Sequence, residues 1–152
     1  MAIPDPAGVI DWVERPGSRI GMTDLATALR LRPEDGVDTL VLLVEDTELE
    51  RAQAPVPPDL DLIRYPIPDR GVPPDRATFA DLLAAIGERL AGGLAVVIAC
   101  HGGFGRTGTV AACVFIAAGQ TPAEAIQLVR ATRPGTIETE AQLAFVEDWR
   151  PT

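Results

Sequence analysis

The sequence contains no lysine and no asparagine, and its basic residues are all arginine. Lys+Arg amounts to 13 residues against 22 for Asp+Glu, a formal net charge of −9 at pH 7. A domain this acidic is poorly suited to bind nucleic acid or an anionic membrane, so we expect neither as a partner. The use of arginine at every basic position indicates the coding bias of a GC-rich genome, and we therefore expect a bacterial source.

The sequence also has no apolar run of membrane-spanning length. The longest, Leu94–Cys100 and Val110–Ala118, are too short to cross a bilayer. The first residues, MAIPDPAGVIDWV, have no basic region and do not read as a signal peptide. We therefore expect a cytoplasmic protein, in which the two cysteines, Cys100 and Cys113, do not form a structural disulfide.

The length and the 47% hydrophobic content favour a single domain over residues 1–152. The runs Thr39–Val44 and Leu94–Cys100 are typical of strands covered on both faces, and residues 9–13, 19–22 and 60–67 are further strand candidates. Helical segments alternate with these strands. The pattern predicts an α/β fold with a central, largely parallel sheet flanked by helices.

Helix starts are marked by capping residues. Thr23 is predicted to cap a helix that covers Leu25, Ala28 and Leu29, with Leu31 as a further candidate. Asp75 is predicted to cap a helix whose apolar residues follow helical spacing: Phe79, Leu82, Leu83, Ile86 and Leu90. Capping boxes at Thr121 and Thr139 open two more helices near the end of the chain. A further helix is expected from about residue 107 to residue 118.

The stretch ACHGGFGRTG, residues 99–108, fits two different anion-binding loops. Gly103, Gly105 and Gly108 form G-x-G-x-x-G, the fingerprint of a dinucleotide-binding turn. That fingerprint also needs a second strand ending in an acidic residue about 20 positions on. Here a helix capped by Thr121 follows instead. A dinucleotide-binding protein is therefore the weaker interpretation.

The other interpretation is C-x5-R, from Cys100 to Arg106. A helix N-terminus and Arg106 both favour a thiolate on Cys100, and the arginine fork matches two phosphate oxygens. Thr107 can donate a hydrogen bond to the sulfur when it leaves. The predicted phosphate-binding residues are therefore the whole loop: His101, Gly102, Gly103, Phe104, Gly105 and Arg106.

The stretch CHGGFGRTG resembles the signature loop of the cysteine-based protein tyrosine phosphatase superfamily. The compact size is similar to the dual-specificity branch, and the layout to kinase-associated phosphatases. The resemblance implies a phosphocysteine intermediate on Cys100, a cradle closed by Arg106 and assistance from Thr107. It implies no metal and no organic cofactor, and a phosphorylated protein or small phosphate monoester as substrate.

The family also uses a general acid on a separate loop, and Asp69 lies 31 residues before Cys100 in YPIPDRGVP. Its alternative role is that of a turn residue. Asp75 is the rival acid, although capping a helix already explains it. Gln142 could position the hydrolytic water or simply complete the capping box of Thr139.

One position departs from the family pattern. The family has a histidine directly before the cysteine, where this chain has Ala99. The only histidine, His101, follows the cysteine and either lines the pocket rim or is a plain exposed loop residue. The departure keeps a second hypothesis open, a non-catalytic phosphate-binding module. Cys113, on an apolar helix face, is expected in the core.

Overall fold

The structure is a computed structural model that describes residues 9–151. Two predictions concern residues 1–8 and Thr152: the single domain is expected to include them, and the N-terminal segment is expected not to be a signal peptide. Residues 1–8 and Thr152 lie outside the described residues. Within residues 9–151, none of the helices combines the length and the apolar character that crossing a bilayer requires.

A five-stranded sheet with the order β1-β2-β5-β3-β4 forms the centre of the fold. Strand β1 (Asp11–Arg15) pairs antiparallel with β2 (Ser18–Asp24). Strands β2, β5 (Ala95–Cys100), β3 (Thr39–Leu42) and β4 (Asp61–Arg64) are mutually parallel. The predicted α/β fold with a largely parallel sheet is therefore confirmed.

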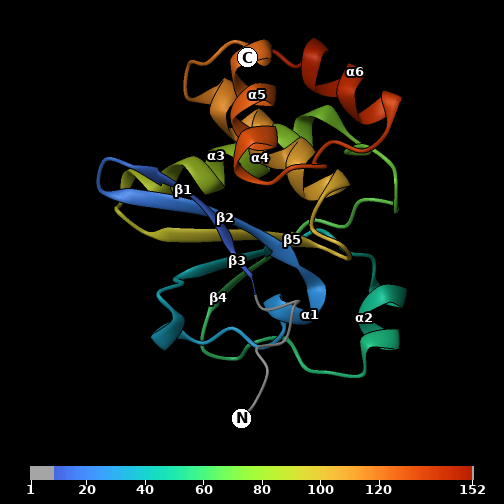
Figure 1. Cartoon of the computed structure of the whole chain (residues 1–152). Helices are drawn as coiled ribbons and strands as arrows, with labels where there is room; N and C mark the ends of the chain where they lie inside the picture. Colours follow the sequence, from blue (N-terminus) through green and yellow to red (C-terminus); the bar gives the residue numbers. More distant parts are fainter. Residues whose placement is uncertain (1–8, 152) are drawn as a thin grey trace.

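Helices flank this sheet (Figure 1). In this view α3–α6 gather above the sheet, and α1 and α2 lie at its lower right. The bounds are α1 Leu25–Ala28, a 3₁₀ turn at Pro33–Asp35, α2 Asp46–Ala52, α3 Arg76–Ala91, α4 Gly105–Ala117, α5 Pro122–Thr132 and α6 Glu140–Asp148.

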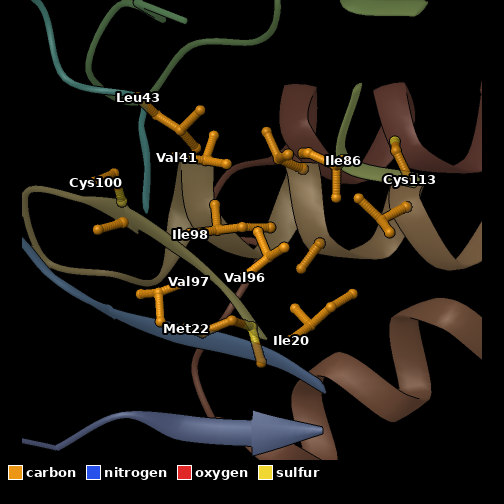
Figure 2. Close-up of a cluster of buried hydrophobic side chains, with 14 of the residues drawn as sticks. Ile20, Met22, Val41, Leu43, Ile86, Val96, Val97, Ile98, Cys100 and Cys113 are labelled. Atoms are coloured by element: carbon orange, nitrogen blue, oxygen red, sulfur yellow. The ribbon is translucent and has the colours of Figure 1, made fainter. Parts of the chain in front are cut away.

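The core lies between the sheet and its helices, and every residue of β5 is buried. The apolar positions predicted for α3 are all buried, and Asp75 caps this helix by accepting a hydrogen bond from Thr78 N at 2.9 Å. Figure 2 shows Cys113 within the buried cluster, as expected, and Cys100 at the end of β5. Both cysteines are free thiols.

The prediction that Thr23 caps the first helix is wrong. Strand β2 continues through Thr23 to Asp24, which is in register with Cys100 of β5. Asp24 therefore caps α1 and accepts a hydrogen bond from Thr27 N at 2.7 Å. The helix is also shorter than expected, a single turn that ends at Ala28.

Several strands and one more helix differ from the predicted limits. Strand β1 lies at Asp11–Arg15 instead of residues 9–13, and β2 covers Ser18–Asp24 instead of residues 19–22. Strands β3 and β4 end earlier than expected, at Leu42 and Arg64. Helix α4 begins at Gly105, two residues before the expected start. Helix α2 carried no prediction, because Leu49 is its only large apolar residue and no helical periodicity marks it. The earlier ends of β3 and β4, the start of α4 and helix α2 all lie at the carboxyl edge of the sheet.

Candidate active site

Cys100 is the last residue of the central strand β5 and is 3% exposed. Because β2 and β3 lie parallel on either side of it, the segments that follow all three strands meet at one edge of the sheet. Leu25 follows β2, Glu48 follows β3 and Asp69 follows β4. The topology thus brings residues from three other parts of the chain to the loop after Cys100.

We call residues 101–105 the anion loop. Four consecutive carbonyl oxygens of this loop accept hydrogen bonds from outside it. Leu25 N donates to His101 O at 3.0 Å. Arg133 donates to Gly102 O at 3.2 Å and to Gly103 O at 2.8 Å. Phe104 O accepts from the backbone N–H groups of residues 108 and 137, each at 3.0 Å.

These bonds to four carbonyl oxygens determine where the amides of the loop point. In a trans peptide unit the N–H lies opposite the C=O. Because the carbonyls of residues 101–104 face outward, the N–H groups of residues 102–105 face the inside of the loop. Converging amides at the start of a helix form a concave site for an anion. The anion loop therefore has the geometry of a phosphate cradle.

Two glycines permit this conformation. Gly103 has φ +80°, and a Cβ there would collide with the backbone carbonyl of Thr23. A Cβ on Gly105 would lie 2.7 Å from Glu138 Oε1 and 2.9 Å from Gln142 Oε1. The loop is thus packed between the end of β2 and the start of α6, and larger residues do not fit.

Arg106, in the first turn of α4, is only 2% exposed, yet it carries a full positive charge. Its Nη1 donates to Glu48 Oε2 and its Nη2 to Glu48 Oε1, both at 2.8 Å. Nη1 also donates to Ile67 O at 2.9 Å. Burial alone would lower the pKa of Arg106, but the hydrogen bond to Glu48 and the electrostatic interactions with Cys100, Glu48 and Asp69 outweigh burial and raise the pKa.

Glu48 is a site residue that the sequence analysis missed. It lies in the unpredicted helix α2 and is 14% exposed. The hydrogen bonds from Arg106 hold its pKa below the ordinary value, against the raising effect of burial. The available signal was the spacing Glu45-x-x-Glu48, since Glu48 Oε2 accepts from Glu45 N at 2.8 Å.

Asp69 lies in the turn after β4, with its side chain 73% exposed. Its Oδ1 is 3.3 Å from Arg106 Nη2. The turn is closed by a bond from Gly71 N to Pro68 O at 2.8 Å. Asp69 also lines a cavity of about 400 Å³ together with Glu48 and His101. The structure thus brings the expected acid to the mouth of the anion loop, whereas Asp75 caps α3.

Gln142 is fully buried and bonds to protein groups on two sides. Its Oε1 accepts from Glu138 N at 3.0 Å and from Thr139 N at 3.1 Å, so it completes the capping box of α6. Its Nε2 donates to Gly71 O at 3.1 Å and ties α6 to the Asp69 turn. The structure therefore gives Gln142 the capping role; its role in positioning water stays a prediction.

The remaining predicted positions sit close to this arrangement. Thr107 is fully buried, and within the described residues its hydroxyl has no hydrogen-bond partner. His101 is exposed and lines the 400 Å³ cavity and an adjoining, more apolar cavity of about 690 Å³. Ala99 is fully buried in β5, between β2 and β3.

Residues 11–146 match the family described as the dual-specificity and protein tyrosine phosphatase domain of Swiss Army Knife proteins. The chain belongs to this phosphatase family. It is 29% identical over 130 residues to human protein tyrosine phosphatase type IVA 3, covering 84% of this chain and 72% of the relative. A bovine protein tyrosine phosphatase domain-containing protein 1 is 46% identical over 55 residues. That match covers 36% of this chain and spans only 7% of the relative's length.

Solved structures agree with the family. The active form of the phosphatase Tk-PTP has a TM-score of 0.73 and 27% identity, with 94% of this chain and 95% of that chain covered. A kinase-associated phosphatase whose catalytic-site cysteine is replaced by serine has a TM-score of 0.79 and 21% identity. The match covers 96% of this chain and 95% of the kinase-associated phosphatase, and the two chains share the fold.

The phosphatase fold leaves the three glycines of the dinucleotide fingerprint with other roles. Gly103 and Gly105 shape the anion loop, and a Cβ on Gly108 would lie 2.6 Å from the Cβ of Thr136. Helices α5 and α6 follow α4, and the described chain after Cys100 holds no second strand to carry the acidic residue that a dinucleotide site needs. The weaker interpretation therefore has no structural support.

Proposed function

We propose that this phosphatase-family chain hydrolyses phosphate monoesters through a phosphocysteine on Cys100, with protein phosphotyrosine as the first candidate substrate and phosphoserine or phosphothreonine as the second. The observation that carries the proposal is the set of four outward carbonyls in the loop directly after Cys100. With these carbonyls outward, the amides of residues 102–105 would face an oxyanion bound in front of the sulfur.

In the first step the loop amides and Arg106 hold the phosphate oxygens. The hydrogen bonds of Arg106 use Nη1 and Nη2, which leaves its Nε–H for an oxygen of the phosphate. The Cys100 thiolate attacks phosphorus, and the bond to the leaving oxygen breaks. Protonated Asp69 gives its proton to that oxygen. The products of this step are the free alcohol and phosphocysteine.

In the second step the Asp69 carboxylate accepts a proton from water while the water oxygen attacks phosphorus. The phosphorus–sulfur bond breaks and releases inorganic phosphate and the Cys100 thiolate. In this proposal Thr107 donates to that sulfur; the support is that its buried hydroxyl lies in the first turn of α4 and has no other hydrogen-bond partner in the described residues. Neither of these two reaction steps requires a metal ion or an organic cofactor.

The lining of the two cavities supports the aryl substrate. Leu25, Ala52 and His101 line both cavities, and Ala26 and Leu29 extend the larger one. An aromatic ring attached to a phosphate in the anion loop would have apolar walls on this side. The net charge of −9 disfavours nucleic acid and anionic membranes as partners. We also propose that the chain forms one domain and that the protein is bacterial and cytoplasmic. The exclusive use of arginine supports the bacterial source, and the two free thiols support the cytoplasmic location.

A non-catalytic phosphate-binding module is the second candidate. It is favoured by Ala99, which stands where the family has its histidine. The bidentate bond between Glu48 and Arg106 also favours it, because that bond already occupies two nitrogens of the arginine. Such a module would bind oxyanions without turnover.

Hydrolysis of p-nitrophenyl phosphate, with and without vanadate, separates the two candidates. We expect turnover that vanadate inhibits. Cys100→Ser should abolish turnover and keep affinity for inorganic phosphate, because the loop amides and Arg106 remain. Cys113→Ser is the matched control, since Cys113 is buried in the core, where burial raises its pKa. Tight vanadate binding without turnover in the wild type would establish the binding module.

A further inference from the structure

Arg133, the residue that ends α5, is an arginine that the proposed chemistry does not use. It is 7% exposed, and all three of its guanidinium nitrogens are bonded. Nε donates to Gly103 O at 2.8 Å and Nη2 to Gly102 O at 3.2 Å. Nη1 donates to Asp11 Oδ2 at 3.0 Å. The guanidinium also lies over the Phe104 ring, 4.4 Å from its centroid.

These contacts join three separate parts of the fold. Asp11 opens the edge strand β1, Arg133 ends α5, and residues 102–104 are the middle of the anion loop. A guanidinium is rigid and planar, so fixing one of its edges on a carboxylate fixes the direction of its other donors. The ion pair with Asp11 thus aims Nε and Nη2 at two adjacent carbonyls of the loop.

The two bonds act on the inner face of the loop through the peptide planes. Holding the carbonyls of Gly102 and Gly103 outward holds the N–H groups of Gly103 and Phe104 inward. Glycine would otherwise allow these peptide units to rotate at little cost. The cation is also kept on the outside of the loop, so it is not itself one of the groups that contact the phosphate.

We propose that Arg133 is a positioning residue that fixes the amides of Gly103 and Phe104 in the direction that binds phosphate, and that Asp11 orients Arg133 for this task. This inference rests on the proposed function of the loop as a phosphate cradle. It predicts that removing Arg133 weakens oxyanion binding through the backbone, although the side chain never contacts the anion.

The first test compares Arg133→Met with Arg89→Met. Arg89 is the matched control because it also joins a carboxylate, Asp61 at 2.6 Å, to a carbonyl, Ala85 O at 3.0 Å. It is distant in function, since Asp61 begins β4 and so lies at the end of the sheet opposite the anion loop. Both variants lose an ion pair and main-chain contacts, but only Arg133→Met loses contacts to the loop.

The readout is the dissociation constant of inorganic phosphate and of tungstate, measured by calorimetry well below the melting temperature of each variant. We expect Arg133→Met to weaken binding about tenfold or more, the value of one ordinary hydrogen bond to the anion. Arg89→Met should match the wild type. Equal affinities for wild type and Arg133→Met would overturn the inference, and so would an equal loss in both variants.

A milder pair keeps the test valid if Arg133→Met folds poorly. Arg133→Lys retains the charge but cannot direct two donors at adjacent carbonyls, and Asp11→Asn retains Arg133 without its ion pair. Both should weaken phosphate binding by less than Arg133→Met does. Affinities equal to the wild type in both variants would contradict the proposed positioning role.

Binding and turnover together separate this inference from the proposed function. If the wild type turns over substrate and Arg133→Met keeps the wild-type phosphate affinity, the positioning role of Arg133 is refuted and the proposed phosphatase function stands. Phosphate binding by the wild type without turnover, weakened in Arg133→Met, supports the inference and sinks the phosphatase. A wild type that binds neither phosphate nor tungstate would overturn both.

Discussion

The ion pair between Glu48 and Arg106 gives a prediction whose size follows from the structure. In Glu48→Gln the carboxylate that receives both Nη groups of Arg106 becomes a neutral amide with one acceptor oxygen. Arg106 is 2% exposed, so its charge is left in a site with little water. We expect this variant to lower the free energy of unfolding.

The expected loss is about 2 kcal/mol at pH 7. Removing one partner of a fully buried ion pair costs about 3–5 kcal/mol. Three features reduce this cost here: glutamine still accepts one bond, Arg106 keeps its bond to Ile67 O, and Glu48 is 14% exposed. Asp69, 3.3 Å from Nη2, also remains as a counter-charge.

The pH dependence has a definite sign. The pKa of Glu48 is lowered in the folded state, so its carboxylate stabilises the fold above the ordinary glutamate pKa, and this contribution is lost as the pH falls through the lowered value. The difference between wild type and Glu48→Gln should therefore be largest near neutral pH and shrink in acid.

Urea unfolding at pH 7 and at about pH 3 measures both quantities. Glu50→Gln is the control, because Glu50 is an exposed carboxylate on the same helix, and it should change stability by less than about 0.5 kcal/mol. A Glu48→Gln effect no larger than that of the control at pH 7 would refute the reasoning, as would an effect that is undiminished in acid.

Three further substitutions give separate predictions. Asp69→Asn should lower kcat on phosphotyrosine by about 10²–10⁴-fold and by less on an aryl phosphate whose leaving group needs no proton; equal losses in steady-state kinetics would move the acid elsewhere. Gly103→Ala should lower the free energy of unfolding by roughly 2 kcal/mol or more, because φ is +80° and the new Cβ would meet the Thr23 carbonyl; urea unfolding measures this, and a neutral effect would contradict it. Gly87→Ala should raise the free energy of unfolding by about 0.5–1 kcal/mol with kcat unchanged, because Gly87 lies inside α3 and a Cβ there meets nothing within 4 Å; a lower melting temperature would show that the site is not open.

The parts of the fold that could be predicted are those in which local sequence and tertiary structure agree. The apolar runs that became β3 and β5 are buried on both faces, and the boxes at Thr121 and Thr139 cap α5 and α6 as expected. The loop after Cys100 could also be predicted, because the cysteine, the glycines and the arginine lie in one short stretch of the sequence. Thr23 failed because pairing with β5 extends β2 by one residue more than the capping preference suggested.

The residues that sequence reasoning missed act across long separations. Glu48 lies 58 residues from Arg106, and Arg133 lies 30 residues from Gly103, so no local spacing connects either pair. Glu48 is one of 22 acidic residues and Arg133 one of 13 arginines, so residue type alone does not single out either of them. The parallel sheet brings Glu48 to Arg106, because it gathers the segments after β2, β3, β4 and β5 at one edge. The packing of α5 against β1 and α4 brings Arg133 to the anion loop.

The charges in the site explain how so acidic a protein could accept a phosphate. Arg106 faces both Glu48 and Asp69, so this trio carries a net negative charge while Asp69 is ionised. The net charge of this trio therefore does not attract a dianion, so we expect the inward amides of residues 102–105 to supply much of the attraction, together with the free Nε–H of Arg106 and with Arg51 on the wall of the cavity of about 400 Å³. Protonation of Asp69 neutralises the trio, and it is also the state in which Asp69 can donate to the leaving oxygen. The same proton would thus favour both binding and the first chemical step, and a phosphate bound while Asp69 is ionised would be held less tightly.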